Sequence, residues 1–457
     1  MKIKISDKLT ITEAPERLVR EIEGRLTIPN PAYEDAVRMG RWTGDLKPTL
    51  RYYRHEGDAI ITPRGFIRQV ISIARSRGVS GRVFDRRRTL PEVDFAFKGT
   101  LKPYQKAALA DILRRDSGTL SSPTGSGKTV MALASIARRK QPTLVIVHTK
   151  ELLNQWIDRI ETFLGIPKNE IGRIGGGKFT IGKRVTVGIV NSVYGRAEEI
   201  REHVGHLVVD ECHRTPSRTF TEAVSAFDCQ YILGLSATPW RRDKLSRLIY
   251  WFVGDVVHKI ERGALVEEGH ILPFDVIRRE TDFTSYFDPA TEYSQVLSEL
   301  TRDRDRNIMI ATDVALEFSN ESGVCLVLSD RREHCLELQR LLADIFTINA
   351  DVLTGDLSKA DREAVVARLE AGQVQVLIAT GQLIGEGFDC KGLTTLFLAT
   401  PIKFDGRLLQ YIGRVMRPAP GKERALVYDY VDGNVGVLAA SARTRQRVYE
   451  RQASVGG

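Results

Sequence analysis

The sequence is poor in cysteine and has no long hydrophobic run. Its five cysteines, Cys212, Cys229, Cys325, Cys335 and Cys390, lie far apart and form no Cys-x-x-Cys motif. This pattern argues against a disulfide framework and a structural zinc cluster, and it favours a reducing compartment. No apolar run approaches the ~18 residues of a membrane span, and the N-terminus, MKIKISDKLT, lacks the apolar stretch of a secretory signal. We therefore expect a soluble intracellular protein with no membrane partner.

Composition and charge narrow the class of protein further. The chain has 457 residues, of which 42% are hydrophobic and 27% charged, so it is neither disordered nor fibrous. Lys and Arg number 67 against 58 Asp and Glu, a net charge of +9. Residues 36–90 alone hold 13 basic and four acidic side chains. Such a patch suits a polyanion such as nucleic acid; a solvated basic face without a partner is the alternative.

The chain divides into blocks of different pattern. Residues 1–95 combine short strand-like runs with a helix at about Gly65–Arg77, and they form a predicted N-terminal accessory domain that contains most of the basic patch. Residues 96–262 and 263–440 each alternate apolar runs with helical patterns and form two predicted α/β domains. Residues 441–457 form a predicted C-terminal tail.

The apolar runs in the two α/β blocks are nearly continuous, as in strands that are buried on both faces. The first block contains TLVIV, VTVGIV, HLVVD and YILGLS, and the second contains VCLVLS, VQVLIAT and TLFLAT. These runs alternate with helical patterns such as KELLNQWIDRIETFL and REHCLELQRLLADIF. The pattern predicts two parallel sheets, each covered by helices.

The strongest sign of chemistry is a glycine-rich loop before a predicted helix, VMALASIARR. The loop consists of Ser122, Pro123, Thr124, Gly125, Ser126, Gly127, Lys128 and Thr129. Its backbone N–H groups can converge on a phosphate at the positive end of the helix. Lys128 supplies a positive charge for the β- and γ-phosphates, and the Thr129 hydroxyl is a candidate Mg²⁺ ligand. We predict a nucleotide site at this loop.

An acidic pair ends the apolar strand HLVVD about 80 residues after this loop. Asp210 is predicted to hold Mg²⁺ through water, and Glu211 to polarise the water that attacks the γ-phosphate. His213 follows two residues later and is expected to couple the nucleotide to the rest of the site.

These motifs resemble those of the superfamily 2 helicases and translocases over residues 100–432. The resemblance implies an α/β fold with two tandem RecA-like parallel-sheet domains and a small α+β N-terminal domain, and ATP and Mg²⁺ as cofactors. Asp210-Glu211-Cys212-His213 resembles motif II in its DExH form. Gln105 matches the glutamine that reads the adenine, while Ser236 and Thr238 match the motif that links hydrolysis to nucleic-acid movement.

Two further motifs of the resemblance fall in the second α/β block. Gly385 and Asp389 belong to a segment that resembles motif V, and the resemblance assigns them to ATP binding. Gln410 begins a segment that resembles motif VI and is assigned to coupling. Arg414 and Arg417 of that segment are the implied arginine fingers, which would make cleavage depend on domain closure.

Polar residues after strands of both blocks are candidates for contacts with nucleic-acid phosphates. They are Thr149, Asn191, Thr354, Gly355 and Thr380. A turn or helix cap explains each of them equally well. Together they resemble the loops with which the family grips the backbone, and such contacts would carry no sequence specificity.

The N-terminal block resembles the small N-terminal domain of the XPB-like and phage UvsW-like DNA helicases. The matching segments contain Arg41 and Trp42, then Arg64, which we predict to contact nucleic acid. Trp42, Tyr52, Tyr53 and Phe66 interleave with arginines, so they either stack on bases or form the core of the small domain. Residues 239–243 resemble the Arg-Glu-Asp element of XPB-like helicases, with Arg242 in place of the acidic residue.

The sequence thus predicts a DNA-dependent ATPase that remodels double-stranded, forked or branched DNA in recombination or repair. We expect it in the cytoplasm of a bacterial or phage-infected cell, at the nucleoid. One alternative is the motor subunit of a restriction or defence complex whose nuclease is on another chain. The other is an ATP-switched DNA clamp that does not unwind.

Overall fold

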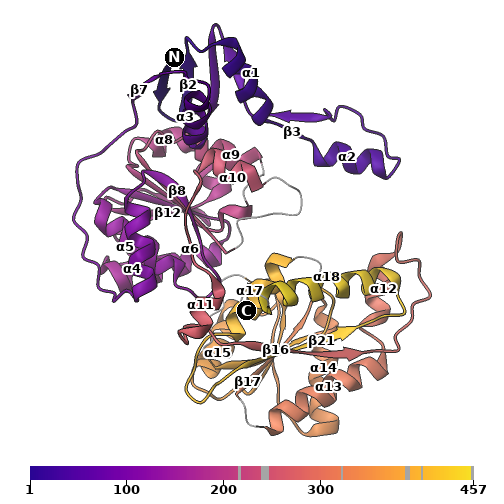
Figure 1. Ribbon diagram of the computed structural model, residues 1–457. Coiled ribbons are helices and arrows are strands. Elements are labelled where there is room, and N and C mark those ends of the chain that lie inside the picture. Colours follow the sequence, from indigo (N-terminus) through magenta and orange to yellow (C-terminus); the bar gives the residue numbers. More distant parts are fainter. Residues whose placement is uncertain (215–217, 238–245, 321–322, 386–391, 403–404, 454–457) are drawn as a thin grey trace. The chain divides into compact units, whose positions relative to one another are not determined.

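The structure is a computed structural model that describes residues 1–214, 218–237, 246–320, 323–385, 392–402 and 405–453 (Figure 1). The chain forms two compact units, which are considered separately below. The first contains residues 1–122 and 127–260, and the second contains residues 261–457 together with residues 123–126 of the glycine-rich loop. The boundary after Ile260 lies two residues before the predicted one.

The N-terminal residues form a five-stranded sheet of their own. Its order is β5-β6-β2-β1-β7, antiparallel except where β1 pairs with β7. Apolar residues alternate along β1 and β2, so Ile3, Leu9 and Ile11 turn one face of the sheet toward two helices. The elements are β1 Lys2–Ile5, β2 Lys8–Thr12, β5 Arg54–Glu56, β6 Ala59–Pro63, β7 Arg82–Asp85, α1 Glu16–Arg25, η1 Arg64–Phe66 and α3 Ile67–Ser76.

This sheet shares its core with the first α/β domain. Leu248 and Trp251 of α10 are buried in one cluster with the N-terminal apolar residues. Arg64 donates hydrogen bonds to the backbone oxygens of Phe227 and Gln230, both at 3.2 Å. The N-terminal block therefore has a separate sheet, as predicted for a small α+β domain, but its core is continuous with the next domain.

The segment after β7 is held along the first α/β domain by polar contacts. Arg88 pairs with Asp228 at 3.1 Å. Leu90 exchanges two backbone hydrogen bonds with the Gln141 side chain, at 2.8 and 2.9 Å.

The first α/β domain contains an eight-stranded sheet of order β11-β10-β12-β9-β13-β14-β8-β15, with helices on both faces (Figure 1). All neighbouring pairs are parallel except β10 with β11. The strands are β8 Ser117–Ser121, β9 Thr143–Val147, β10 Gly172–Gly175, β11 Lys178–Thr180, β12 Val185–Ile189, β13 His206–Val209, β14 Tyr231–Ser236 and β15 Val256–Lys259. The helices are α4 Pro103–Leu113, α5 Lys128–Arg139, α6 Lys150–Leu164, α7 Val190–Tyr194, α8 Ala197–Arg201, η2 Cys212–Arg214, α9 Arg218–Ser225 and α10 Ser246–Phe252.

The second unit contains a six-stranded sheet of order β16-β21-β20-β17-β19-β18, parallel throughout. The strands are β16 Phe274–Glu280, β17 Val324–Ser329, β18 Asp351–Leu353, β19 Val376–Thr380, β20 Leu393–Leu398 and β21 Ala425–Val431. The helices are α11 Arg262–Glu267, α12 Tyr293–Leu300, α13 Arg304–Ser319, α14 Arg332–Phe346, α15 Lys359–Glu370, α16 Gly381–Gly385, α17 Asp405–Val415 and α18 Gly436–Ala453. The prediction of two parallel α/β sheets is confirmed.

Helix α18 crosses the predicted boundary at residue 440. Its buried Arg445 donates to Asp429 of β21 at 2.9 Å, and Tyr449 donates to the same carboxylate at 3.0 Å. Residues 441–453 therefore belong to the second unit and are not a separate tail.

The shared core makes a specific prediction about Gly65. A Cβ added there would lie 2.6 Å from the backbone oxygen of Tyr250 and 2.7 Å from that of Trp251, neither of which is a flexible side-chain end. We expect Gly65→Ala to lower the free energy of unfolding by about 1–3 kcal/mol through overpacking. Urea unfolding followed by circular dichroism measures this change.

Gly24→Ala is the matched control. Gly24 lies in α1, and nothing lies within 4 Å of an added Cβ. Alanine is favoured over glycine in a helix by about 1 kcal/mol, so this variant is expected to gain stability. Equal gains in both variants would show that the N-terminal sheet does not dock closely on α10.

Candidate active site

Three neighbouring strands of the first sheet lead to the predicted site residues. β8 is followed by the phosphate loop, β13 by the acidic pair, and β14 ends at Ser236. β8, β14 and β13 are adjacent and parallel, with Ser121 paired to Ser236 in the register. Carboxyl ends of parallel strands meet at one edge of a sheet, where α/β proteins place their ligands. The backbone N–H of Ser122 donates to the backbone oxygen of Ser236 at 2.9 Å, which joins the start of the loop to the end of β14.

The phosphate loop has the backbone that its glycines allow. Gly125 and Gly127 have φ of +88° and +84°, a region that residues with a Cβ rarely adopt. Gly127 is the N-cap of α5, so Lys128 and Thr129 occupy the first turn of that helix. The Lys128 ammonium donates to the Ser122 backbone oxygen at 3.0 Å. Burial lowers the pKa of Lys128, while the charges of Glu211 and Asp210 oppose that shift.

Gln105 lies beside this loop, where the resemblance requires it. Its side-chain oxygen accepts from the Lys102 backbone N–H at 3.0 Å, and its amide nitrogen donates to the Tyr104 hydroxyl at 3.3 Å. A Cβ at Gly127 would lie 2.5 Å from that amide nitrogen. The positive φ of Gly127 favours glycine at this position, and the close approach brings α4 to the phosphate loop. Adenine recognition by Gln105 stays a prediction.

The acidic pair combines a buried carboxylate, Asp210, with a partly buried one, Glu211, whose backbone is strained. Asp210 accepts from the Trp156 indole N–H at 2.7 Å and from the Glu211 backbone N–H at 2.9 Å. Burial and the neighbouring charge of Glu211 raise the pKa of Asp210 to about 6, against the opposing effects of Trp156 and Lys128. Glu211 has a φ of +48°, which is rare for a residue other than glycine and typical of functional sites.

His213 connects the acidic pair to Ser236. Its Nδ1 lies 3.1 Å from Oε2 of Glu211 and 3.2 Å from the Ser236 hydroxyl. Ser236 thus contacts the motif II segment through its side chain and the phosphate loop through its backbone oxygen. Thr238 and Asp389, which are also predicted site residues, lie outside the described residues, as does the segment 239–243.

The donor set suits Mg²⁺ better than a transition metal. Mg²⁺ is held by hard oxygen ligands, usually one or two carboxylates together with substrate phosphates. Asp210 and the Thr129 hydroxyl are such donors, and the second carboxylate, Glu211, lies next to Asp210. Among the described residues there is no cluster of three or more His, Cys, Asp or Glu side chains that could hold a metal ion by itself.

Three of the predicted residues of the second unit lie on two helices that touch, α16 and α17. Gly385 ends α16, whereas Gln410 and Arg414 are four residues apart and share a face of α17. Arg417 follows the end of α17 at Val415. The Tyr411 hydroxyl donates to the backbone oxygen of Gly381 at 2.6 Å, which joins α17 to α16, the helix that ends at Gly385. Their roles in ATP binding and coupling stay predictions.

The candidates for phosphate contacts differ in what their side chains already do. Thr149 caps α6, because its hydroxyl accepts from the Leu152 backbone N–H at 3.3 Å. Asn191 and Gly355 are exposed, Thr380 is partly buried and Thr354 is buried. A direct contact therefore suits Asn191 and Gly355 better than Thr354.

Arg64 does not fit its predicted role in nucleic-acid binding. Only 4% of its surface is exposed, and its guanidinium donates to the backbone oxygens of Phe227 and Gln230, which lie between α9 and β14. A buried arginine held by two carbonyl groups anchors the N-terminal block instead. Phe66 is likewise buried in the core, whereas Arg41 and Trp42 are exposed.

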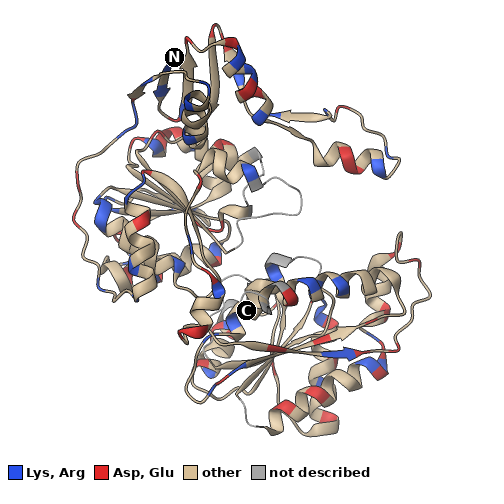
Figure 2. Cartoon of the chain, viewed as in Figure 1, with Lys and Arg blue, Asp and Glu red and all other residues tan. Residues whose placement is uncertain are grey.

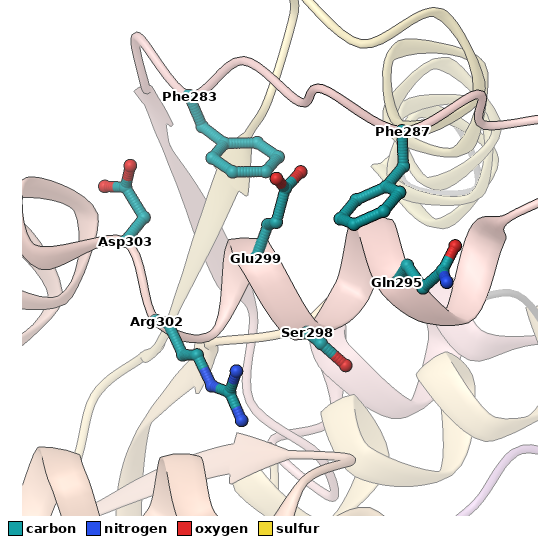
Figure 3. Close-up of a pocket in the computed structure, with 7 residues that line it drawn as sticks. All are labelled: Phe283, Phe287, Gln295, Ser298, Glu299, Arg302 and Asp303. Atoms are coloured by element: carbon teal, nitrogen blue, oxygen red, sulfur yellow. The ribbon is translucent and has the colours of Figure 1, made fainter.

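A hollow of about 390 Å³ lies in the second unit (Figure 3). Phe283 and Phe287 line it together with Glu299 of α12, whose side chain points toward the two rings. Arg302, just after this helix, also lines the hollow. Glu299 accepts from the Ser285 hydroxyl at 2.5 Å and from the Tyr286 backbone N–H at 3.2 Å, so its carboxylate holds the loop. None of the predicted site residues lines this hollow.

Comparisons with known proteins agree with the motifs. The family described as "Type III restriction enzyme, res subunit" matches residues 98–241, and the family described as "Helicase conserved C-terminal domain" matches residues 312–419. The chain is a superfamily 2 helicase of the XPB/UvsW type. It is thus an ATP-dependent enzyme, and its two parallel sheets are tandem RecA-like domains.

Three relatives illustrate the range of this helicase group. The "DNA 3'-5' translocase XPB2" of Sulfurisphaera tokodaii is 26% identical over 76% of this chain and 84% of its own. The "ATP-dependent DNA helicase uvsW" of Enterobacteria phage T4 is 23% identical over 91% and 86%. A protein of Acanthamoeba polyphaga mimivirus described as an ATP-dependent RNA helicase is 25% identical over 79% and 70%.

A solved structure supports the fold. A fragment of a protein described as an HsdR subunit of a type I restriction enzyme from Vibrio vulnificus is 18% identical, with a TM-score of 0.58. The likeness covers 76% of this helicase and 66% of that chain.

Trp156 is a residue of the site that sequence reasoning missed. It appeared there only as one apolar position in the pattern of residues 150–164, and it is indeed buried on the inner face of α6. Its indole N–H adds a polar role, because it is a donor to the Asp210 carboxylate. The signal in the sequence was weak: a buried tryptophan needs a partner for its N–H, but spacing does not show which.

Trp156→Phe is expected to keep the packing and remove that donor. Without it the Asp210 carboxylate is less well oriented, so the Mg²⁺ concentration for half-maximal ATP hydrolysis should rise about tenfold, as is typical of outer-shell changes. A Mg²⁺ titration of the ATPase rate measures this effect.

Trp251→Phe is the control, since Trp251 is buried in the N-terminal core at a site with no predicted ligand. It should lose stability without a change in the Mg²⁺ requirement. If both variants showed the same Mg²⁺ dependence as the wild type, Trp156 would have a packing role alone.

Proposed function

We propose that this helicase is a Mg²⁺- and ATP-dependent DNA motor that remodels forked or branched DNA in recombination or repair. The observation that carries the motor activity is the link through Ser236, which contacts the phosphate loop on one side and the motif II histidine on the other. Because Ser236 is hydrogen-bonded to the phosphate loop and to His213, its position is expected to depend on whether the nucleotide site is occupied.

The proposed hydrolysis assigns one task to each group of the site. Lys128 and the N–H groups of the phosphate loop hold the phosphates, and Gln105 reads the base. When bound, Mg²⁺ neutralises phosphate charge. Asp210 and Thr129 are the residues that would hold it. Glu211 orients and deprotonates the attacking water, and Arg414 and Arg417 supply positive charge to the γ-phosphate.

Coupling is proposed to run from Glu211 through His213 to Ser236. His213 lies within about hydrogen-bond distance of both, so a change in the charge of the γ-phosphate site alters a contact at the end of β14. Thr238, Gln410, Gly385 and Asp389 complete the proposed set of coupling and nucleotide-binding residues.

DNA is the proposed track because of the relatives and the charge. Two of the three relatives named above are described as acting on DNA, and their names are the support for that choice. Figure 2 shows lysine and arginine residues spread over the strands, helices and loops of the N-terminal part. Phosphate contacts by such residues bind DNA without reading its sequence. In the described residues no helix is long and apolar enough to cross a membrane, and we propose a cytoplasmic site of action.

Lys128→Ala and Glu211→Gln are expected to abolish ATP turnover while DNA binding persists. Lys128→Ala removes the positive charge that binds phosphate. Glu211→Gln keeps the shape of the side chain but removes the carboxylate that would accept a proton from the attacking water. Turnover in a coupled ATPase assay and DNA affinity by fluorescence anisotropy measure the two properties. Lys106→Ala on α4 and Glu198→Gln on α8 are exposed controls that should keep both. Persistent turnover in both site variants would refute the assignment.

A panel of polynucleotides tests the substrate. ATP hydrolysis is measured at one salt concentration with no polynucleotide, single-stranded DNA, duplex DNA, a four-way junction and RNA. The strongest stimulation is expected from the junction. Stimulation by RNA alone would contradict the proposal.

A second candidate is the motor subunit of a restriction or defence complex. The matching family description and the HsdR-like fold favour it. It predicts no stimulation by any polynucleotide until a partner chain is added. A nucleotide-switched clamp differs again, since it would hydrolyse ATP on DNA without displacing a strand.

A further inference from the structure

An arm projects from the N-terminal sheet (Figure 1). Strands β3 Thr27–Pro29 and β4 Thr49–Arg51 pair with each other and form its base. Helix α2, Pro31–Arg38, and the loop of residues 39–48 form the rest. Leu26 and Ile28 tie the base of the arm to the N-terminal core, whereas the outer part of the arm is largely exposed.

The outer part of the arm is nevertheless held in a defined conformation by hydrogen bonds. Asn30 caps α2 by accepting from the Ala32 backbone N–H at 3.1 Å, and its amide nitrogen donates to the Lys47 backbone oxygen at 2.8 Å. The Arg41 backbone N–H donates to the oxygen of Ala36 at 2.8 Å, and that of Leu46 donates to Thr43 at 2.9 Å. These bonds close the loop on both sides of Trp42.

Trp42 is presented by this loop in an unusual way for an apolar side chain. It is 89% exposed, and its neighbours Met39 and Val37 are 60% and 54% exposed. A Cβ on Gly44 would lie 2.6 Å from the indole ring, so the ring lies against a glycine, which has φ of +47°. An ordered loop that exposes several large apolar side chains is the mark of a binding surface.

The charges near Trp42 favour a polyanion. Arg41, Lys47 and Arg51 are exposed, and each has no acidic partner within the part of the chain that the structure describes. Arg38 pairs with Asp35 at 2.6 Å, which leaves Glu34 and Asp45 as the other acidic groups of the arm. An open indole face flanked by unpaired cations is the combination with which proteins stack on bases and hold a nucleic-acid backbone.

We propose that the arm is a DNA-binding element in which Trp42 stacks on an unpaired or terminal base at a branch point, while Arg41 and Lys47 contact the adjacent phosphates. Because a base inside a duplex has both faces covered, an exposed indole gains contact only where the stack is interrupted. The arm thus distinguishes a junction from continuous duplex. This inference rests on the proposed function, since it concerns how that motor recognises its DNA.

The test compares Trp42→Ala, Trp42→Phe and an arm replacement in which residues 31–47 become Gly-Gly, a two-residue turn between the paired strands. Affinity for a fork and for a duplex of equal length is measured by fluorescence anisotropy. A fork with 2-aminopurine at the branch reports stacking directly, because stacking quenches its fluorescence. Trp42→Ala is expected to weaken fork binding about tenfold, change duplex binding little and remove the quenching. The arm replacement also removes Arg41 and Lys47, so it is expected to remove the quenching and to weaken binding to both DNAs, with the larger loss on the fork.

Three comparisons make the result specific. Trp42→Phe keeps an aromatic face and should restore most of the fork affinity. Arg41→Gln should weaken binding to fork and duplex alike and reduce the salt dependence by about one phosphate contact. Tyr286→Ala removes an aromatic side chain that is 99% exposed in the second unit and should leave fork binding unchanged.

The outcomes separate this inference from the proposed function. If DNA stimulates ATP hydrolysis but Trp42→Ala and the arm replacement bind the fork as the wild type does, the arm inference is wrong and the motor stands. If no DNA binds or stimulates the wild type, the proposed function fails. If the arm replacement abolishes self-association in sedimentation velocity and leaves fork affinity intact, the arm is a protein interface and the inference is again overturned.

Discussion

The hydrogen bond from the Ser122 backbone N–H to the Ser236 backbone oxygen positions the candidate active site of this helicase, because it joins the start of the phosphate loop to the end of β14. It exists because β8 and β14 are parallel neighbours in register, so both strands end at the same level. β13 is the next strand along, and its end carries Asp210. A shift of one residue in any of these pairings would reverse the side-chain faces and separate the phosphate loop from the acidic pair.

The order of the strands was not readable from the sequence, although the strands were. Periodicity and apolar runs predicted the helices at 150–164 and 332–346 with the same ends that the structure shows, and the parallel class of both sheets. Local patterns carry that information because a buried strand and an amphipathic helix each impose their own period. The adjacency of Gln105 to Gly127 and of Trp156 to Asp210 depends on tertiary packing, which no local pattern encodes.

The positive charge of the N-terminal block is a second property that depends on tertiary packing and could not be assessed from the sequence alone. Of the 13 basic residues between positions 36 and 90, Arg38, Arg54, Arg77, Arg87 and Arg88 pair with carboxylates, and Arg64 is buried against backbone oxygens. Composition counts these six with the rest, because burial and pairing are properties of the fold. The charge available to a polyanion is therefore smaller than the sequence suggests, and it is carried by Arg41, Lys47, Arg51, Arg68, Arg75, Arg82 and Arg86.

The conformation of the acidic pair is unfavourable to folding, and the packing of the surrounding sheet holds it in place. Asp210 is buried beside Glu211, and Glu211 has a backbone conformation that costs about 1–3 kcal/mol in a residue with a side chain. Both conditions persist because β13 is packed on each side and Trp156 holds the carboxylate from α6. The raised pKa of Asp210 has the same cause: two carboxylates in one buried place favour a proton or a cation between them. A site that gains most when a cation and an anionic nucleotide arrive together is one whose conformation depends on its occupancy. In the proposed coupling, the contacts of His213 with Glu211 and Ser236 are the route from that occupancy to the sheet.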